Sequence, residues 1–216
     1  MLTIHAADLL LPGGRRSALP DGAVLVDGRE LAAVGPYGEL AAAHPAARIR
    51  RWPGVLMPGL VNPYGPELLE QAYHPDPNEA DELGTEPLTG EALARLEMTG
   101  VRWGESARRG VQRLLAHGVV AVAGDLWRPA AVAAVTRAGL SVEERFGDPD
   151  GPAVFDPLAG RSPAEAMLLP LPVDGEKGGE ATFAVFDVPD EAALAERGAG
   201  TCLATVVAGR LVHRRR

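Results

Sequence analysis

The stretch Val55–Gln71, VLMPGLVNPYGPELLEQ, marks the point at which the pattern of the sequence changes. It opens with a short, nearly continuous apolar run, VLMPGLVN, which is typical of a strand buried in a parallel sheet. The segment that follows it, HPDPNEADELGTEP, is polar, acidic and contains prolines, and we expect it to be a surface loop. The stretch therefore predicts that a parallel α/β region begins near residue 58.

The region after this stretch alternates between helical and strand patterns. Apolar side chains share one helical face in ESARRGVQRLLAHG, which ends at a glycine suited to terminating a helix. The pattern then gives a buried strand, a second helix with Pro129 in its first turn, and a weaker strand. The predicted helix, strand, helix and strand cover residues 105–118, 119–125, 128–139 and 140–146. This order predicts a parallel sheet with right-handed crossovers.

Both ends of the chain have β character. The first 58 residues contain short strands, a hairpin that turns at Asp27-Gly28, and one short helix that stops before Pro45. The C-terminal part returns to a strand, a helix capped by Asp190, and a hairpin that turns at Ala208-Gly209. Between them, residues 148–180 are rich in glycine and proline, so we expect loops and one short helix capped by Ser162. We predict a β domain from residues 1–57 with 181–216, and a second domain from residues 58–180.

Composition excludes several classes of protein. With a net charge of −8, the chain is not expected to bind nucleic acid or anionic membranes, which require clustered Lys and Arg. The basic ending RLVHRRR is short and is expected to be a solvated tail. No signal-peptide pattern or run of about 20 apolar residues is present, which predicts a soluble cytoplasmic protein. The single cysteine, Cys202, lies in an apolar run and is expected to be a buried structural thiol.

The order of these segments resembles a known superfamily. DGAVLVDGRELAAVGPYGEL leads into VLMPGLVN, and the chain closes with FAVFDV and CLATVVAGRLV. This arrangement resembles the amidohydrolase superfamily, and most closely its imidazolonepropionase and aminodeoxyfutalosine deaminase branch. The resemblance covers residues 1–66, 100–145 and 180–216. It implies that the N- and C-terminal segments form a composite β-sandwich beside a (β/α)8 barrel, whose first strand follows PGLVN.

The chain departs from the superfamily at the metal site. The superfamily continues PGLVN with a His-x-His pair that binds a divalent metal, whereas the corresponding positions here are Tyr64 and Pro66. Proline has no ligating atom, and a phenol is a poor substitute for an imidazole. No other segment supplies the remaining ligands, so we expect no metal cofactor.

The length of the middle region also departs from the superfamily. About 120 residues separate Asn62 from Phe183, whereas a closed barrel requires about 200 or more. We therefore predict an α/β fold with a truncated, open remnant of a TIM-like barrel. Because an open sheet has exposed edges, we hypothesise a homodimer.

The polar residues that remain near the predicted sheet edge form one candidate pocket. His74 and Asp76 follow the first strand, Asp125 follows the second, and Tyr64 and Glu67 lie at the same edge. These residues predict a polar pocket or a weak, oxygen-rich cation site; the alternative, which we favour, is a solvated acidic loop. The other histidines are expected to be structural: His5, His44, His117 and His213.

The resemblance and the missing ligands leave three hypotheses for function. The first is a homologue that has lost metal-dependent C–N hydrolysis and binds a small polar molecule or a partner. The second is an active hydrolase or deaminase acting on C–N bonds through Tyr64, His74 and Asp125. The third is a structural subunit of a larger complex. The glycine clusters, including Lys177-Gly178-Gly179, lack the strand–helix context of a phosphate-binding loop and are expected to be turns.

Overall fold

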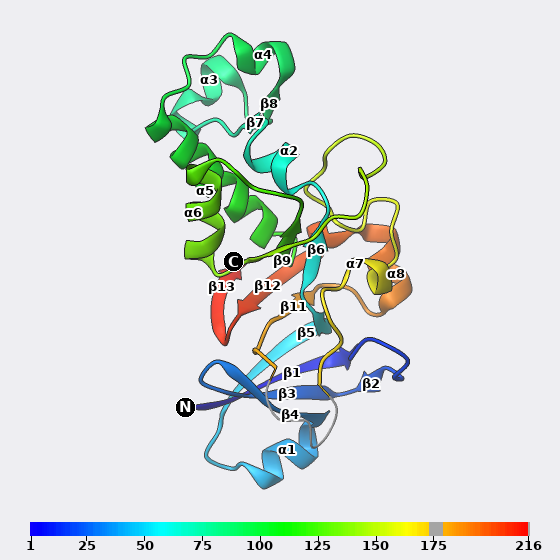
Figure 1. Cartoon of the computed structure of the whole chain (residues 1–216). Helices are drawn as coiled ribbons and strands as arrows, with labels where there is room; N and C mark the ends of the chain where they lie inside the picture. Colours follow the sequence, from blue (N-terminus) through cyan, green and yellow to red (C-terminus); the bar gives the residue numbers. More distant parts are fainter. Residues whose placement is uncertain (173–178, 216) are drawn as a thin grey trace. The chain divides into compact units, whose positions relative to one another are not determined.

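The computed structural model describes residues 1–172 and 179–215 (Figure 1). Most of the predicted LPVDGEKGGE loop, with the turn at Lys177-Gly178, lies outside the described residues. The chain divides into two compact units. The first, here called the composite unit, contains Met1–Val61, Leu115–Val120 and Asp156–Arg216. The second, here called the helical unit, contains Asn62–Leu114 and Ala121–Phe155.

The elements follow one another in a mixed α/β order. The strands are β1 Leu2–Leu10, β2 Leu19–Pro20, β3 Gly22–Asp27, β4 Glu30–Pro36, β5 Arg48–Pro58, β6 Leu60–Asn62, β7 Ala72–Tyr73, β8 Leu88–Thr89, β9 Val119–Ala123, β10 Ser141–Glu143, β11 Phe183–Phe186, β12 Cys202–Val207 and β13 Arg210–Arg214. The α-helices are α1 Tyr37–Ala43, α2 Gly65–Leu69, α3 Ala80–Leu83, α4 Gly90–Ala94, α5 Gly100–Leu115, α6 Pro129–Ala138, α7 Pro163–Ala166 and α8 Glu191–Arg197. Two short 3-10 helices are η1 Pro77–Glu79 and η2 Ala199–Thr201.

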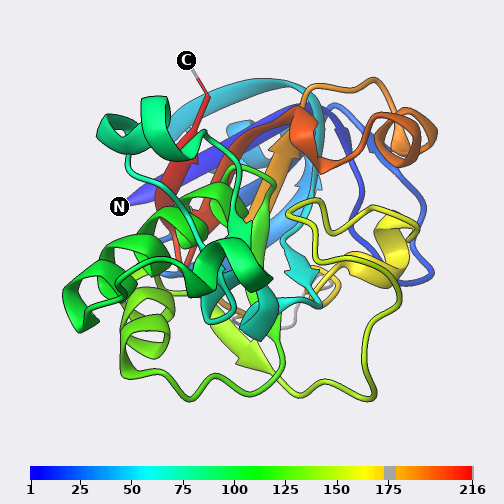
Figure 2. The same ribbon diagram turned by 90° about the horizontal axis from the view of Figure 1, so that it is seen from above.

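The composite unit contains one eight-stranded sheet built from both ends of the chain. Its order is β13-β12-β11-β5-β1-β3-β4, with β2 paired to β1. Figure 2 shows strands from both ends of the chain together, those of the N-terminal part in blue and cyan and those of the C-terminal part in orange and red. Strand β5 joins the two halves, because it pairs in parallel with β1 and antiparallel with β11. The predicted composite of N- and C-terminal segments is therefore confirmed.

The sheet curves so that its two ends meet, which gives the sandwich. Alternate residues of β11 lie on opposite faces, so that Phe183 and Val185 enter one core cluster while Ala184 and Phe186 enter another. The first cluster contains side chains from β3 and from β12. At the closing edge, the turn after β3 touches the turn after β12: a Cβ atom placed on Gly209 would lie 2.0 Å from the carbonyl oxygen of Gly28.

A bulge in β5 lies where the strand exchanges partners. Trp52 is opposite Ala7 and Val55 is opposite Leu9, so two residues of β5 face Asp8 alone. One of the two, Gly54, has φ of +75°, and its N–H donates to Asp8 Oδ2 at 2.8 Å. Beyond the bulge, β5 pairs with β11 as well as with β1. The bulge therefore provides the bend that lets one strand serve both halves of the sheet.

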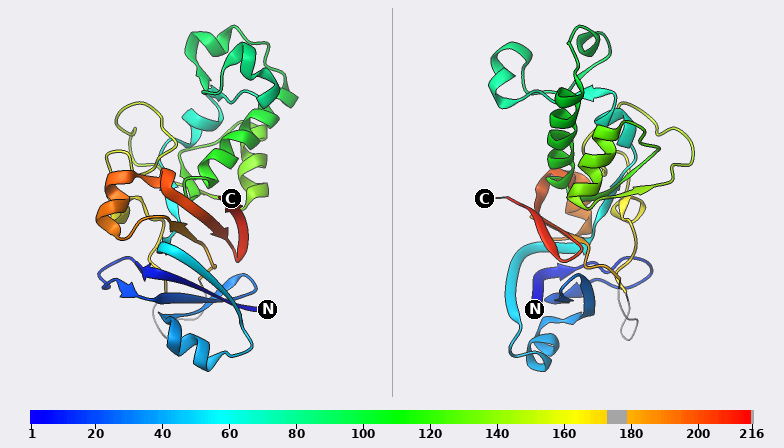
Figure 3. Two further views of the ribbon diagram at one scale, coloured as in Figure 1. Left: turned by 180° about the vertical axis from the view of Figure 1, so that it is seen from behind. Right: turned by 60° about the vertical axis from the view of Figure 1, so that its left-hand side comes forward.

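The helical unit contains the parallel part of the fold. The three-stranded sheet has the order β10-β9-β6, and the boundary between the units runs through β6 and β9. Strands β9 and β10 are parallel and are connected by α6, as the βαβ pattern predicted. Helices α5 and α6 lie side by side (Figure 3). Three strands form this sheet within the described residues, which confirms the predicted open α/β remnant.

Two details of the sequence prediction were wrong. The acidic segment HPDPNEADELGTEP after Tyr73 is not only a loop, since it contains η1 and α3. Helix α5 begins at Gly100 rather than at Glu105. The predicted caps at Ser162 and Asp190 are confirmed. Within the described part of the chain, no helix is both long and apolar enough to cross a membrane.

Candidate functional site

The two positions that hold metal ligands in the amidohydrolase pattern are engaged in packing here. The Tyr64 hydroxyl donates to the carbonyl oxygen of Asp150, and its backbone N–H donates to Asn62 Oδ1 at 2.9 Å. Pro66 is buried in the first turn of α2, and its ring lies so close to Gly124 that a Cβ atom there would be 2.8 Å from Pro66 Cδ. Neither side chain presents an atom suited to a zinc-type ion.

A polar cavity of about 720 Å³ lies beyond the carboxyl ends of β9 and β10. Arg145 contributes a cation to its lining: Nη1 lies 2.9 and 3.0 Å from the two carboxylate oxygens of Glu67, and Nη2 lies 3.3 Å from Asp148 Oδ1. Asp125, which follows β9, lines the same cavity. The full lining is Pro66, Gly124, Asp125, Val142, Glu143, Glu144, Arg145, Gly147 and Asp148. We call this space the carboxyl-edge cavity.

His74 belongs to the core of the helical unit. Its backbone N–H donates to Ser106 Oγ at 2.9 Å, and its ring Nε2 is 2.7 Å from the carbonyl oxygen of Leu68. The ring packs against Phe155, with the centroids 5.4 Å apart. Burial first, and then the charges of Arg113 and Arg109, lower the pKa of the imidazole to about 4. The imidazole is therefore neutral at pH 7 and contributes to packing.

Asp76 is held on the same side of the unit as His74. Its carboxylate caps η1 and lies 3.0 Å from Nη1 of Arg109. Nε of Arg109 also donates to the carbonyl oxygen of His74 at 2.8 Å. Arg109 therefore connects His74 and Asp76 to α5, whereas Arg145 lies with Glu67 and Asp125. The five predicted site residues therefore do not form one pocket. His74 and Asp76 form one group, Glu67 and Asp125 form another, and Tyr64 is separate from both.

A network around Glu79 was not predicted. Its carboxylate accepts hydrogen bonds from the Tyr73 hydroxyl and the Asp76 backbone, and it lies 2.7 Å from Nη2 of Arg102. These contacts, the Tyr73 hydrogen bond first, lower the pKa of Glu79 to about 2. The sequence Asp76-Pro-Asn-Glu79 has the pattern of a capping box, and this pattern could have predicted the contact between Asp76 and Glu79.

Glu70 was also not predicted, although it organises the start of α6. Its buried Oε1 accepts from the backbone N–H groups of Trp127 and Arg128 at 2.9 and 2.7 Å. A carboxylate at this position satisfies donors that a helix N-terminus leaves unpaired. Trp127 and Arg128 are 57 and 58 positions from Glu70 in the sequence, so no local pattern could reveal these contacts.

The donor set does not fit the divalent metal that the resemblance implies. Among residues 1–172 and 179–215, no three His, Cys, Asp or Glu side chains gather as a metal site requires. Cys202 is buried in β12, where burial raises the pKa of its thiol to about 11. That thiol is therefore a neutral core group, as predicted.

The fold defines an α/β protein whose two ends share one composite sheet. Comparison with protein families agrees with this class: residues 22–47, from β3 to the end of α1, match the imidazolonepropionase-like composite domain of bacteria. The predicted resemblance to the composite domain of amidohydrolases is therefore confirmed over these residues. No curated protein matches the chain.

Several solved structures resemble the fold at low sequence identity. Ochratoxinase from A. niger is 20% identical, with a TM-score of 0.44, and the match covers 66% of this chain and 30% of that one. Guanine deaminase from Bradyrhizobium japonicum is 18% identical, with a TM-score of 0.42 and coverage of 66% and 34%. Aminofutalosine deaminase from Helicobacter pylori is 18% identical, with a TM-score of 0.38 and coverage of 68% and 34%. The chain spans about a third of the length of these structures.

Proposed function

We propose that this amidohydrolase-like protein binds a small polar molecule in the carboxyl-edge cavity and does not catalyse metal-dependent C–N hydrolysis. The observation that carries the proposal is the state of Tyr64 and Pro66. The phenol is bonded to a backbone carbonyl and the proline is buried against Gly124, so neither supports an ion where the superfamily holds one. His74, the nearest imidazole in sequence, is buried and has its Nε2 on the Leu68 carbonyl oxygen.

The cavity itself has the features of a binding site for a polar ligand. It lies where parallel sheets of α/β proteins hold ligands, beyond the carboxyl ends of the strands. Arg145 is held by Glu67 and so presents a fixed guanidinium, while Asp125 and Glu144 offer carboxylates. A small molecule with both donor and acceptor groups is complementary to this lining.

Hydrolysis is tested by ammonia release from guanine and adenosine in the presence of added Zn²⁺. These two compounds are chosen because guanine deaminase and adenosine deaminase occur among the structural neighbours. We expect no release above that of a protein-free control, because the donor set for a catalytic metal is missing. Release that rises with protein concentration and disappears on adding a chelator would refute the proposal.

We also propose that the protein is cytoplasmic and forms a homodimer through β10. This strand lies at the end of the described three-stranded sheet, and nearby apolar side chains are open to solvent: Val142 is 48% exposed and Phe146 is 89% exposed. A free sheet edge with apolar neighbours favours pairing with a second copy.

Light scattering at micromolar concentration tests the dimer. We expect twice the chain mass of 22.6 kDa, and a shift to the monomer mass in the Phe146→Asp variant, because a charge at the edge opposes pairing. Leu169 is also exposed but lies in the composite unit, so Leu169→Asp is the matched control and should leave the dimer intact. A monomer mass for the unmodified chain would contradict the proposal.

A further inference from the structure

A second open space lies between helices α5 and α6 of the helical unit. This groove has a volume of about 630 Å³, and its lining residues differ from those of the carboxyl-edge cavity. It is within the size range of sites that bind small organic ligands. The groove is lined by Gly100, Val101, Trp103, Gly104, Arg108, Arg128, Pro129, Ala130, Ala133, Ala134 and Arg137.

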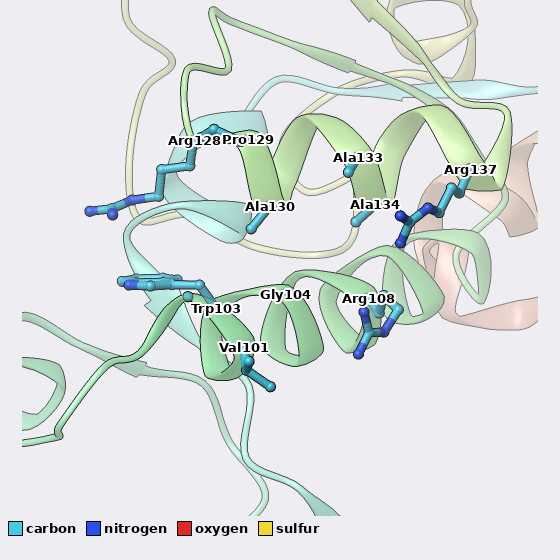
Figure 4. A pocket seen from close by; sticks show the side chains of 11 residues that line it. Val101, Trp103, Gly104, Arg108, Arg128, Pro129, Ala130, Ala133, Ala134 and Arg137 are labelled. Atoms are coloured by element: carbon cyan, nitrogen blue, oxygen red, sulfur yellow. The ribbon is translucent and has the colours of Figure 1, made fainter.

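Small side chains keep the groove open. Ala130 and Ala134 point from α6 toward α5, and Gly104 faces them from α5 (Figure 4). A Cβ atom on Gly104 would meet only the end of the Arg108 side chain, 3.7 Å away. Larger residues at these positions would interdigitate and fill the space between the helices. The groove therefore has a shallow apolar floor rather than a packed helix contact.

The charged groups of the groove are all cations. Arg108, Arg128 and Arg137 line it, and no acidic residue does so among the described residues, although the whole chain has a net charge of −8. In the described part of the chain, no carboxylate lies within ion-pair distance of Arg137. Within residues 1–172 and 179–215, the ion pair of Arg108 is a distant one, 4.0 Å from the half-exposed Glu105.

Two of these cations face one another at one end of the groove. Arg108 extends from α5 and Arg137 from α6 into the same space (Figure 4). Like charges brought together repel, and an anion placed between them removes that repulsion. Guanidinium groups bind carboxylates through paired N–H donors, which gives both strength and orientation.

The other end of the groove is formed by Trp103 and Arg128, which stack on one another (Figure 4). The guanidinium of Arg128 lies 4.3 Å from the centroid of the Trp103 ring, and Nε of Arg128 donates to the carbonyl oxygen of Glu70 at 3.2 Å. This hydrogen bond fixes Arg128 over the indole, which holds the ring as one wall of the groove. The stacked pair gives this end of the groove a flat wall, beside which a flat apolar group fits.

From these features we propose that the groove binds a small aromatic carboxylate. The carboxylate lies between Arg108 and Arg137, and the ring lies along Ala130 toward Trp103. This site shares no lining residue with the carboxyl-edge cavity, so ligand binding in one does not depend on the other being a binding site.

Calorimetric titration of the full chain with 2-naphthoate tests this inference, with neutral 2-naphthylmethanol and acetate as comparison probes. We expect 2-naphthoate to bind about tenfold more tightly than either comparison probe. 2-Naphthylmethanol lacks the carboxylate, and acetate lacks the aromatic ring. Arg137→Gln should weaken 2-naphthoate binding about five- to tenfold. Arg197→Gln is the matched control, since Arg197 is an exposed arginine in the last turn of α8 and carries the same charge outside the groove.

Filling the groove provides a test that leaves every charge in place. Ala130→Leu adds bulk at a half-buried position that points toward α5 and should abolish 2-naphthoate binding while the circular dichroism spectrum stays unchanged. Equal affinity for 2-naphthoate and 2-naphthylmethanol would overturn the proposal. Unchanged 2-naphthoate affinity in a folded Arg137→Gln or Ala130→Leu variant would also overturn it.

Discussion

Replacing Gly54 with alanine is expected to lower the free energy of unfolding by about 4 kcal/mol or more. A Cβ atom at this position would lie 2.2 Å from the carbonyl oxygen of Phe186 and 2.9 Å from that of Val188. Both are backbone atoms, so relieving the clash requires the backbone to shift. Gly54 also has φ of +75°, which strains any residue with a side chain. In a chain of this size, thermal denaturation should show a fall in Tm of about 8–16 °C.

Gly28→Ala is the matched control for this prediction. Gly28 also belongs to the composite unit and has φ of +61°, but a Cβ atom there meets nothing within 4 Å. It therefore reports the conformational strain alone, about 1–2 kcal/mol. Similar losses in the two variants would show that the bulge in β5 does not hold the sheet together in the way described.

Acidification from pH 7 to pH 4.5 is expected to destabilise the fold by on the order of 5 kcal/mol through two buried histidines. Burial, with the charges of Arg50 and Arg48, lowers the pKa of His5 to about 4, and burial likewise lowers the pKa of His74 to about 4. Between pH 6.5, the ordinary pKa of histidine, and pH 4, the unfolded chain binds a proton at both imidazoles, whereas the folded chain does not. Stability is therefore full above pH 6.5 and falls as the pH decreases toward 4.

Urea denaturation at a series of pH values measures this loss. His74→Gln keeps an N–H donor for the Leu68 carbonyl oxygen but removes a titrating ring, so its stability should depend less steeply on pH between 6.5 and 4. His44→Gln is the control, because it leaves both buried imidazoles in place and should keep the full slope. Glu79, whose pKa is lowered to about 2, weakens the fold only below pH 4.5 and so acts in a separate window. If stability depended equally steeply on pH in the unmodified chain and in His74→Gln, the contribution assigned to the buried His74 imidazole would be contradicted.

Local signals in the sequence predicted most of the elements correctly. The hairpin at Asp27-Gly28 and the helix cap at Asp190 rest on neighbouring residues, and both are confirmed. The capping box from Asp76 to Glu79 was equally local but lay in a segment interpreted as a loop because of its acidity. In that segment, the spacing of residues carried more information than the composition.

Contacts between distant residues could not be predicted in the same way. Strand β5 pairs with β11 as well as with β1, and β5 and β11 are more than 120 residues apart in the sequence. The contact of Glu70 with Trp127 likewise joins two distant loops. His74 and Asp125 were expected at one sheet edge because both follow strands, but the side chain of His74 turns inward to Leu68 and Phe155. Chain order places a residue at an edge, whereas packing decides where its side chain points.

The most direct test of the proposed loss of metal chemistry is the metal content of the purified protein. After incubation with excess Zn²⁺ and exhaustive dialysis, we expect far less than one zinc ion per chain by elemental analysis, because Tyr64 and Pro66 replace the imidazole pair and His74 is buried. One zinc or iron ion per chain that is retained through dialysis, and lost in a folded His74→Ala variant, would contradict the account.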